Sequence, residues 1–417
     1  MNNKFLLLAL ASLLSLSLNA QIFQFRGENR TGKFPNETGL LKQWPTGGPE
    51  ILLEYEGIGE GYSSVISNGK YIYASGKIGD DDYLTCIDFN GNKKWQVSYG
   101  KGWDQAYPGN RGSVTIDGDR LYIISGYDRL SCLNAETGAT IWSKDVHEEY
   151  QGEFHTWGSS ESPLVLDNLV YITPGGSTTT MVAFDKMTGA EVWKSGSVGG
   201  GRGYTSPAVY NINGEDLIIA TTAGFLLAVK PETGEIKASY KYFDDTQWRF
   251  QRNGMIWCAN PVVKGNQIFI SLGYNYAPGA KMLRLNSTNR SFEEVYSNHL
   301  LDNHHGGIVE VDGYMYGSNW LNNNDGNWVC LDWATGETMY DAKWTSKGSI
   351  VYADGLLYLY DEKSGEIGIM KPDPTGFNII SSFKVETGSG FHWAHPFFLN
   401  GMMFHRHGDV LTVYKVK

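Results

Sequence analysis

The chain has 417 residues, of which 51 are glycine and 13 are proline, and 13% are aromatic. Its formal net charge of −11 repels phosphate backbones, so we expect no nucleic-acid partner. Glycine stands well above its average share of about 7%, and its regular spacing indicates turns between strands instead of a disordered chain. A chain of this length can form a single all-β domain.

Residues 1–20 carry a basic start at Lys4, an apolar stretch over 5–18 and small residues ending at Ala20. This pattern is typical of a secretory signal peptide, so we expect cleavage near Ala20 and a periplasmic or secreted mature protein. The alternative is a membrane anchor, but the apolar run is shorter than the about 20 residues that a span needs. No cysteine follows the cleavage position, which argues against a lipoprotein, and no later segment has the length and hydropathy of a membrane span.

From residue 58 onward one pattern recurs eight times: an apolar alternating strand, a tight turn of the NG or DG type, and a second alternating strand. The turn residues lie 42 to 51 positions apart. They are Gly69, Gly118, Asn168, Gly214, Gly265, Gly313, Gly355 and Gly401. A third apolar strand, a Thr-Gly type turn and a fourth strand follow most hairpins, as in SCLNAETGATIW and VAFDKMTGAEVW. Repeated units of four short strands predict the blades of a β-propeller.

The eighth repeat ends at Lys417 after three strands. Its missing fourth strand is matched by residues 47–57 near the start of the chain, GGPEILLEYEG. We therefore predict an all-β, single eight-bladed propeller over residues 21–417, with four-stranded antiparallel blades. The N-terminal strand joins the C-terminal blade and closes the ring, which removes open sheet edges.

A glycine and a tryptophan four positions later recur after the third strands, at Gly91–Trp95, Gly138–Trp142 and Gly189–Trp193, and Tyr340 replaces the tryptophan after Gly336. This motif resembles the tryptophan-docking repeat of the quinoprotein-like, PQQ-repeat eight-bladed propellers, in which the ring packs on the next blade's turn. The segments FRGENRTGKFPNETGLLKQWP, NHHGGIVEVDGYMYG and WAHPFFLNG resemble exported bacterial PQQ-like propeller proteins. The resemblance implies either oxidation of an alcohol with PQQ and calcium or a scaffold of the BamB type.

The cysteines depart from the dehydrogenase members of that family, which carry a vicinal cysteine pair beside the quinone. Cys86, Cys132, Cys258 and Cys330 are not adjacent, and Ala183 and Ala228 occupy the slot of Cys132 and Cys330 in other repeats. We expect free, mostly buried thiols on strands and no disulfides. The cofactor is therefore left unassigned, with PQQ and calcium as one alternative.

The starts of the eight first strands should meet at one face of the ring, around the central channel. Residues just before these starts differ in chemistry from blade to blade, which is typical of a shared binding site. We predict catalytic roles for His305, His155, Tyr204, Lys347 and His395. We predict ligand-binding roles for Tyr62, Trp103, Asn110, Arg111, Trp157, Arg202, Trp257, Asn260, His304, His392, Trp393 and His407. The alternative is that these side chains plug the channel or cap strand ends.

Adjacent residues of an extended strand point to opposite sides, so His304 and His305 are not expected to bind one metal ion together. No short metal-ligand spacing occurs, and we predict no metal site. Three functions stay open, each for a monomer. The protein binds or oxidises a small alcohol, polyol or sugar; it is a quinone-independent carbohydrate lyase or hydrolase; or it is a scaffold for a protein partner. No local enzyme motif selects among them.

Overall fold

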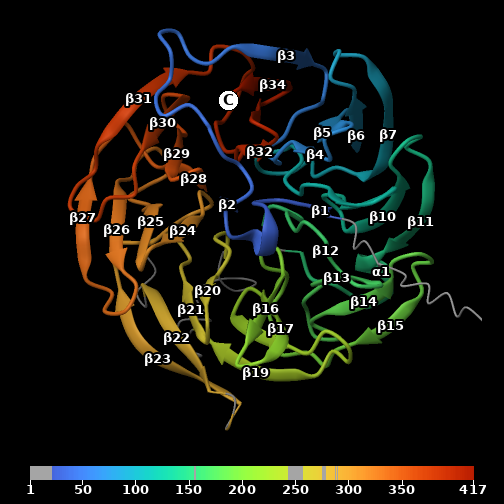
Figure 1. Ribbon diagram of the computed structural model, residues 1–417. Helices are drawn as coiled ribbons and strands as arrows, with labels where there is room; N and C mark the ends of the chain where they lie inside the picture. The colour runs from blue at the N-terminus through green and yellow to red at the C-terminus, as the bar shows by residue number, and fades with distance from the viewer. Residues whose placement is uncertain (1–20, 155, 243–256, 275–278, 287, 289) are drawn as a thin grey trace, which may run out of the picture.

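The computed structural model describes residues 21–154, 156–242, 257–274, 279–286, 288 and 290–417. These residues form eight sheets arranged as blades around a central axis (Figure 1). Within seven blades the strands run in chain order from the axis outward. The prediction of an eight-bladed, all-β propeller is confirmed.

The first four blades follow one another along the chain. They consist of β4 (Ile66–Ser67), β5 (Ile72–Ile78), β6 (Asp81–Ile87) and β7 (Lys93–Lys101); β8 (Thr115–Asp117), β9 (Arg120–Ile124), β10 (Arg129–Asn134) and β11 (Thr140–Asp145); β12 (Leu164–Leu166), β13 (Leu169–Ile172), β14 (Val182–Asp185) and β15 (Glu191–Lys194); and β16 (Ala208–Ile212), β17 (Glu215–Thr221), β18 (Phe225–Val229) and β19 (Ile236–Lys241). A short helix, α1 (Val146–Tyr150), follows β11.

The last four blades complete the ring. They consist of β20 (Val262–Lys264), β21 (Gln267–Ile270), β22 (Ala280–Asn286) and β23 (Ser291–Asn298); β24 (Ile308–Val311), β25 (Tyr314–Ser318), β26 (Trp328–Asp332) and β27 (Thr338–Ala342); β28 (Gly348–Ala353), β29 (Leu356–Asp361), β30 (Glu366–Met370) and β31 (Ile379–Lys384); and β32 (Phe397–Leu399), β33 (Met402–His407) and β34 (Val410–Lys415). The outermost strand of the eighth blade is β3 (Ile51–Glu56), which pairs antiparallel with β34. The predicted closure by the N-terminal strand is therefore confirmed.

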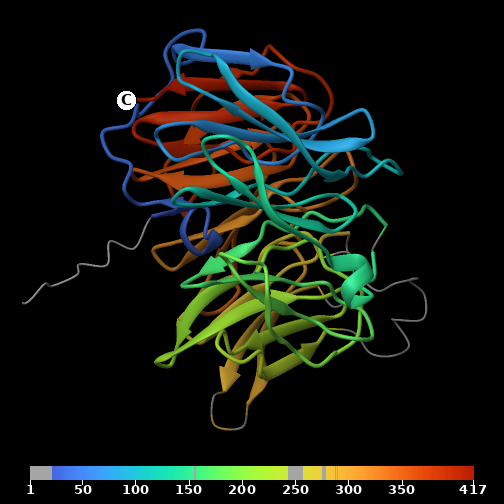
Figure 2. The ribbon, with the colours of Figure 1, turned by 90° about the vertical axis from the view of Figure 1, so that its right-hand side faces the viewer.

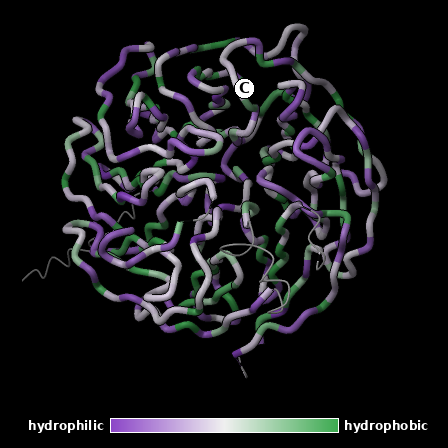
Figure 3. Tube along the Cα trace, turned by 180° about the vertical axis from the view of Figure 1, so that it is seen from behind, coloured by the Kyte–Doolittle hydropathy of each residue, from purple (hydrophilic) through white to green (hydrophobic). Residues whose placement is uncertain are grey.

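The hairpin turns have the backbone that their sequences demand. Asp312, Asp354 and Asn400 adopt positive φ, and so does the glycine that follows each of them. Two successive positive φ values give the turn type that matches the twist of antiparallel strands, which explains why Asn-Gly and Asp-Gly recur here. Seen from behind, hydrophobic segments recur within the blades all around the ring (Figure 3).

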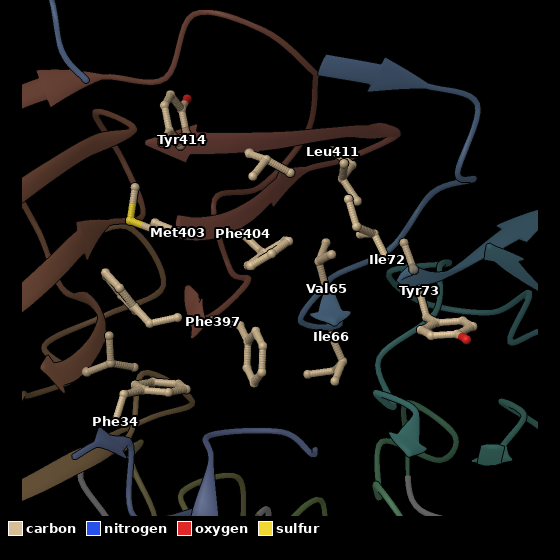
Figure 4. Close-up of a cluster of buried hydrophobic side chains, with 14 of the residues drawn as sticks. Phe34, Val65, Ile66, Ile72, Tyr73, Phe397, Met403, Phe404, Leu411 and Tyr414 are labelled. Atoms are coloured by element: carbon tan, nitrogen blue, oxygen red, sulfur yellow. The ribbon is translucent and has the colours of Figure 1, made fainter. Parts of the chain in front are cut away.

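A hydrophobic core joins the eighth blade to the first, at the point where the ring closes. Phe397 and Phe404 of the eighth blade lie opposite Ile66 and Ile72 of the first, and Phe34 from the N-terminal segment reaches the same cluster (Figure 4). All five side chains are buried. Closure is therefore a packed apolar interface as well as a hydrogen-bonded ladder.

The docking aromatics hold neighbouring blades together. Trp142 Nε1 donates to the Lys186 carbonyl of the third blade at 3.1 Å, and Trp193 Nε1 donates to the Pro231 carbonyl of the fourth at 2.8 Å. A Cβ atom on Gly189 would lie 2.7 Å from the Trp142 ring, so the turn glycine leaves room for that ring. The small residue Ala183 pairs with Trp193 across the third and fourth strands, as Cys132 does with Trp142.

Replacing Gly189 with alanine is expected to destabilise the protein more than replacing Gly355. Both glycines have positive φ, which costs alanine about 1–2 kcal/mol, but only Gly189 faces a ring, whereas the space around Gly355 is open. Overpacking against Trp142 should add about 1–3 kcal/mol to the loss. Urea unfolding of both variants measures the difference, and equal losses would show that docking does not depend on this close approach.

An N-terminal segment crosses the centre of the ring, and we call residues 22–34 the plug. It contains β1 (Ile22–Phe23), the 3-10 turn η1 (Glu28–Arg30) and β2 (Lys33–Phe34). β1 adds a fifth strand inside the second blade, and β2 adds one, in parallel, inside the seventh. The side view places the plug on one face of the ring and α1 on the other (Figure 2).

Two arginines of the plug bind the inner strands of other blades. Arg26 donates to the carbonyls of Ile308 and Ile350 at 2.9 and 3.0 Å. Arg30 donates to the carbonyls of Ser162, Pro163 and Pro207 at 2.7–3.0 Å. Innermost strands present one unpaired edge to the channel, and buried carbonyls there need donors. The plug supplies these donors to four blades and closes the channel.

Candidate functional site

A cavity of about 240 Å³ lies at the axis, on the face opposite the plug, and all eight blades contribute to its wall. Phe25 of the plug also lines it. The other lining residues are Tyr62, Tyr107, Arg111, Trp157, Ser160, Ser162, Tyr204, Cys258, Asn260, Tyr274, His304, His305, Asn323, Asn324, Glu362, Phe391, Trp393 and His395. These residues precede first strands or lie in turns between second and third strands, the segments that meet at this face.

Aromatic rings form much of the wall. Phe391 and Trp393 stack with centroids 4.2 Å apart and an interplanar angle of 8°, and Tyr62 lies 4.8 Å from Trp393. Phe391 is 45% exposed, whereas Trp393 is half-buried, so this pair leads from the mouth of the cavity inward. Flat aromatic groups in a cavity wall favour ligands with flat or sugar-like rings.

Three charged or titratable side chains from the sixth and seventh blades form a linked group in the wall. Lys347 is buried and forms an ion pair with Glu362, and it also donates to the carbonyls of Asn322 and Asn323. His305 Nε2 lies 3.5 Å from Glu362 Oε2. Burial raises the pKa of Glu362 to about 7, although Lys347 opposes this shift, and burial, Lys347 and Arg111 lower the pKa of His305 to about 3. Near neutral pH the imidazole is therefore neutral and the carboxyl is poised to gain or lose a proton.

Several polar atoms on this wall have no hydrogen-bond partner among the described residues. They are His305 Nε2, Glu362 Oε2 and His304 Nδ1, and each is buried. The other nitrogen of His304 lies 2.6 Å from the hydroxyl of Tyr274. Buried polar groups are nearly always paired, so these atoms indicate a place for a polar ligand or ordered water.

His395 has a different environment. Its Nε2 lies 2.8 Å from the carbonyl of His305, and its Nδ1 lies 2.9 Å from Arg26 Nη1. Because a carbonyl only accepts and a guanidinium only donates, Nε2 carries the proton and Nδ1 accepts. Both nitrogens are therefore engaged, and this histidine connects the plug to the cavity wall.

The structure brings nine of the predicted site residues to the cavity: Tyr62, Arg111, Trp157, Tyr204, Asn260, His304, His305, Trp393 and His395. Lys347 stands behind Glu362. Asn260 also holds the fourth blade, because its side chain donates to the Ser206 carbonyl at 2.7 Å. His155 lies outside the described residues.

Six predicted residues lie outside the cavity, in packed or paired positions. Trp257 is fully buried against Tyr242, and Trp103 packs on Tyr127. Asn110 hydrogen-bonds Ser75 and Tyr99. Arg202 forms buried ion pairs with Asp128 and Glu161. The rings of His392 and His407 stack at 3.8 Å. Neighbouring residues of an extended segment point in opposite directions, so only part of each aligned set can face the axis.

Sequence reasoning missed Glu362, Tyr274, Tyr107, Phe391 and the plug residue Phe25. Glu362 and Tyr274 lie in or beside turns between second and third strands, which reach the same face as the first-strand starts. These turns differ in length from blade to blade, so their residues do not fall into one aligned column. Phe25 lies outside the repeats, so no alignment of blades could place it.

Comparisons with known proteins agree with this fold. The family described as outer membrane protein assembly factor BamB matches residues 80–339, more than half of the chain. The chain belongs to this family of PQQ-repeat propellers. A stretch of 94 residues is 31% identical to polyvinylalcohol dehydrogenase of a Pseudomonas species, and it covers 22% of this chain and 14% of that enzyme.

Two solved structures illustrate the range of this fold. BamB of Moraxella catarrhalis superposes with a TM-score of 0.60 and 15% identity, covering 88% of this chain and 99% of that one. A europium-containing methanol dehydrogenase superposes with a TM-score of 0.66 and 12% identity, covering 94% and 90%. At such identities the likeness concerns the fold alone.

The cavity does not match the needs of PQQ with calcium. PQQ is a flat tricarboxylate, yet Arg111 is the sole Lys or Arg among the described lining residues, and Glu362 presents a carboxyl of its own. Lys347 is already paired with that carboxyl. Within the described ranges no group of three His, Cys, Asp or Glu side chains could hold a metal ion, and all four cysteines are free. No helix of the described chain has the length and hydropathy to cross a membrane.

Proposed function

We propose that the central cavity binds a small neutral molecule that carries hydroxyl groups, such as a sugar, a polyol or an alcohol. The observation that carries this proposal is the pairing of stacked rings, Phe391 and Trp393, with unpaired polar atoms of His305 and Glu362 across one cavity. Rings suit the apolar faces of such ligands, and the polar atoms suit their hydroxyl groups. A relative named for polyvinyl alcohol supports the same class of ligand.

The charge of the wall favours a neutral ligand. An anion would meet Glu362, and a cation would meet Arg111, whose guanidinium also lies over the Tyr62 ring at 5.6 Å. Export through the segment 1–20, which lies outside the described residues, is part of the proposal. It would place the cavity in a compartment that such molecules enter from outside the cell.

Cys258 offers a direct test, because it lines the cavity while the other three cysteines are buried. Burial raises the pKa of this thiol to about 12, so labelling by a maleimide should be slow and faster at higher pH. We expect glucose, glycerol, propanol or short polyvinyl alcohol to protect Cys258 from the label. The variant Cys258→Ser should remain unlabelled, which would show that the label reacts at Cys258 and not at another cysteine.

Replacing Trp393 with alanine is expected to weaken binding about tenfold, because loss of one stacking face costs about 1–2 kcal/mol. Tyr127→Ala is the matched control, since Tyr127 follows a second strand at the same face but outside the cavity. Protection of Cys258 as a function of ligand concentration measures both affinities.

Absence of protection by every ligand in the panel would contradict the proposal. Shortened or unsaturated products from a polysaccharide would favour the lyase or hydrolase alternative, and a captured protein partner would favour the scaffold.

A further inference from the structure

We infer that Glu362 is the residue that accepts a hydrogen bond from the ligand's hydroxyl group, with His305 beside it, so that binding depends on an ionised carboxylate. This inference rests on the proposed function and names the group that selects a hydroxyl over an ether. Neither the family match nor the similar structures assign a role to this position.

The turn that carries Glu362 is held by several hydrogen bonds. It connects β29 to β30, and Asp361 accepts hydrogen bonds from the backbone of Lys363 and Ser364 and from that of Ser346. The backbone nitrogen of Glu362 donates to the Lys347 carbonyl at 3.0 Å. These contacts fix the direction of the Glu362 side chain, which is 6% exposed.

The two oxygens of this carboxyl have different surroundings. Oε1 pairs with the ammonium group of Lys347, whereas Oε2 faces His305 and accepts no hydrogen bond from the described residues. A carboxylate is an acceptor on both oxygens, so one of them is held and the other is left for a donor inside the cavity. A hydroxyl group is such a donor, and an ether oxygen is not.

The protonation state depends on every charged group that faces this carboxyl. Lys347 favours its ionised form, and the neighbouring Asp361 opposes it. His305 and His304 are neutral near pH 7, because burial and, for both, the charge of Lys347 lower their pKa values. Arg111 acts on His305 from across the cavity. The carboxyl therefore titrates near pH 7, while the two imidazoles stay neutral.

Another carboxyl with a raised pKa shows why position matters. Burial raises the pKa of Glu161 to about 7 as well, but its oxygens accept from Arg202 and from the Thr173 backbone. Glu161 also lies outside the cavity wall. The pKa of Glu362 also lies near 7, but its Oε2 atom faces the cavity and has no hydrogen-bond partner among the described residues.

The test measures binding of glucose, glycerol and propanol to the full chain between pH 5.5 and 8.5, by protection of Cys258. If the hydroxyl donates to the ionised carboxylate, the affinity should level off above pH 7. Below pH 7 it should fall more and more steeply, up to a limit of tenfold per pH unit. Fully O-methylated glucose, which has no hydroxyl donor, should bind at least tenfold more weakly than glucose. Glu362→Gln should weaken binding about tenfold at pH 8 and remove the pH dependence. Glu362→Asp should bind weakly but keep that dependence.

Asp325→Asn is the matched control. Asp325 lies in the corresponding turn of the sixth blade, is paired with Lys343 and lies outside the cavity, so its variant should keep the wild-type profile. If Glu362→Gln binds glucose as wild type does at every pH, the inference is wrong while the proposed function stands. If none of the probes protects Cys258 in the wild type, the proposed function fails and the inference fails with it.

Discussion

Removal of residues 21–57 is expected to lower the stability of the protein by roughly 5 kcal/mol or more, a large share of the 5–15 kcal/mol typical of folded proteins. The deletion takes away β3, so that β34 becomes an open edge, and it removes Phe34 from the core that joins the eighth blade to the first. It also removes the donors that Arg26 and Arg30 supply to the inner strands. Thermal unfolding followed by circular dichroism should show a fall in Tm of at least about 6 °C.

A shorter deletion separates the two contributions. Removal of residues 21–34 keeps β3 and its ladder with β34 but takes away the plug. The Tm of this variant should therefore lie between those of the wild type and the longer deletion. It should also open the floor of the cavity, because Phe25 is lost. An unchanged Tm in the longer deletion would show that the ring does not depend on its N-terminal strand.

Replacement of Arg202 by methionine is expected to cost about 3–5 kcal/mol at pH 8, because two buried carboxyl groups lose their cation. Arg202 Nε lies 3.2 Å from Asp128 Oδ1, and Nη1 lies 3.1 Å from Glu161 Oε2, with all three side chains almost fully buried. Burial already raises the pKa of both acids, and Arg202 limits that rise. Without the cation both pKa values should rise further.

The loss should therefore depend on pH in a defined direction. The folded pKa of Glu161 is about 7, above its ordinary value of 4.5, so its contribution to stability is full below pH 4.5 and is lost as the pH rises through 7. In the variant the higher pKa extends this decline to higher pH, so the difference from wild type should be small near pH 5 and largest near pH 8. The exposed Arg129 provides the control, since Arg129→Met should stay within about 0.5 kcal/mol. A loss of stability that is the same at pH 5 and pH 8 would contradict this role of Arg202 as the cation for the two acids.

The fold could be predicted because each blade repeats the same physical requirements. The turn pairs such as Asp354-Gly355 need positive φ, the glycine below each docking ring needs an absent Cβ, and both recur at blade spacing. Ring closure followed from counting, since three strands at one end of the chain matched one at the other. The plug could not be predicted, because FRGENR has no repeat and its arginines bind carbonyls that any sequence carries.

The candidate site could be predicted only as a region. The aligned strand starts led correctly to the axis, but alignment does not say which of two neighbouring side chains faces it. Trp257 points into the core, whereas Cys258 lines the cavity. Arg202 and Asn110 have structural roles, because Arg202 forms an ion pair and Asn110 a hydrogen bond with buried side chains of other blades. Glu362 depends on a turn whose length differs between blades, which a column of aligned residues cannot capture.

The closure of the ring by β3 also sets the order in which the protein can fold. Next to that ladder, the backbone nitrogen of Lys415 donates to the carbonyl of Glu50, 365 residues earlier in the chain. A ribosome makes β3 long before its partner β34, so β3 has to wait while the blades between them form. Contacts this distant in sequence slow folding and leave an unpaired edge during the wait. Once β34 is in place, its ladder with β3 and the core beside it join the two ends of the ring, so opening this seam is one route by which the folded protein can begin to unfold.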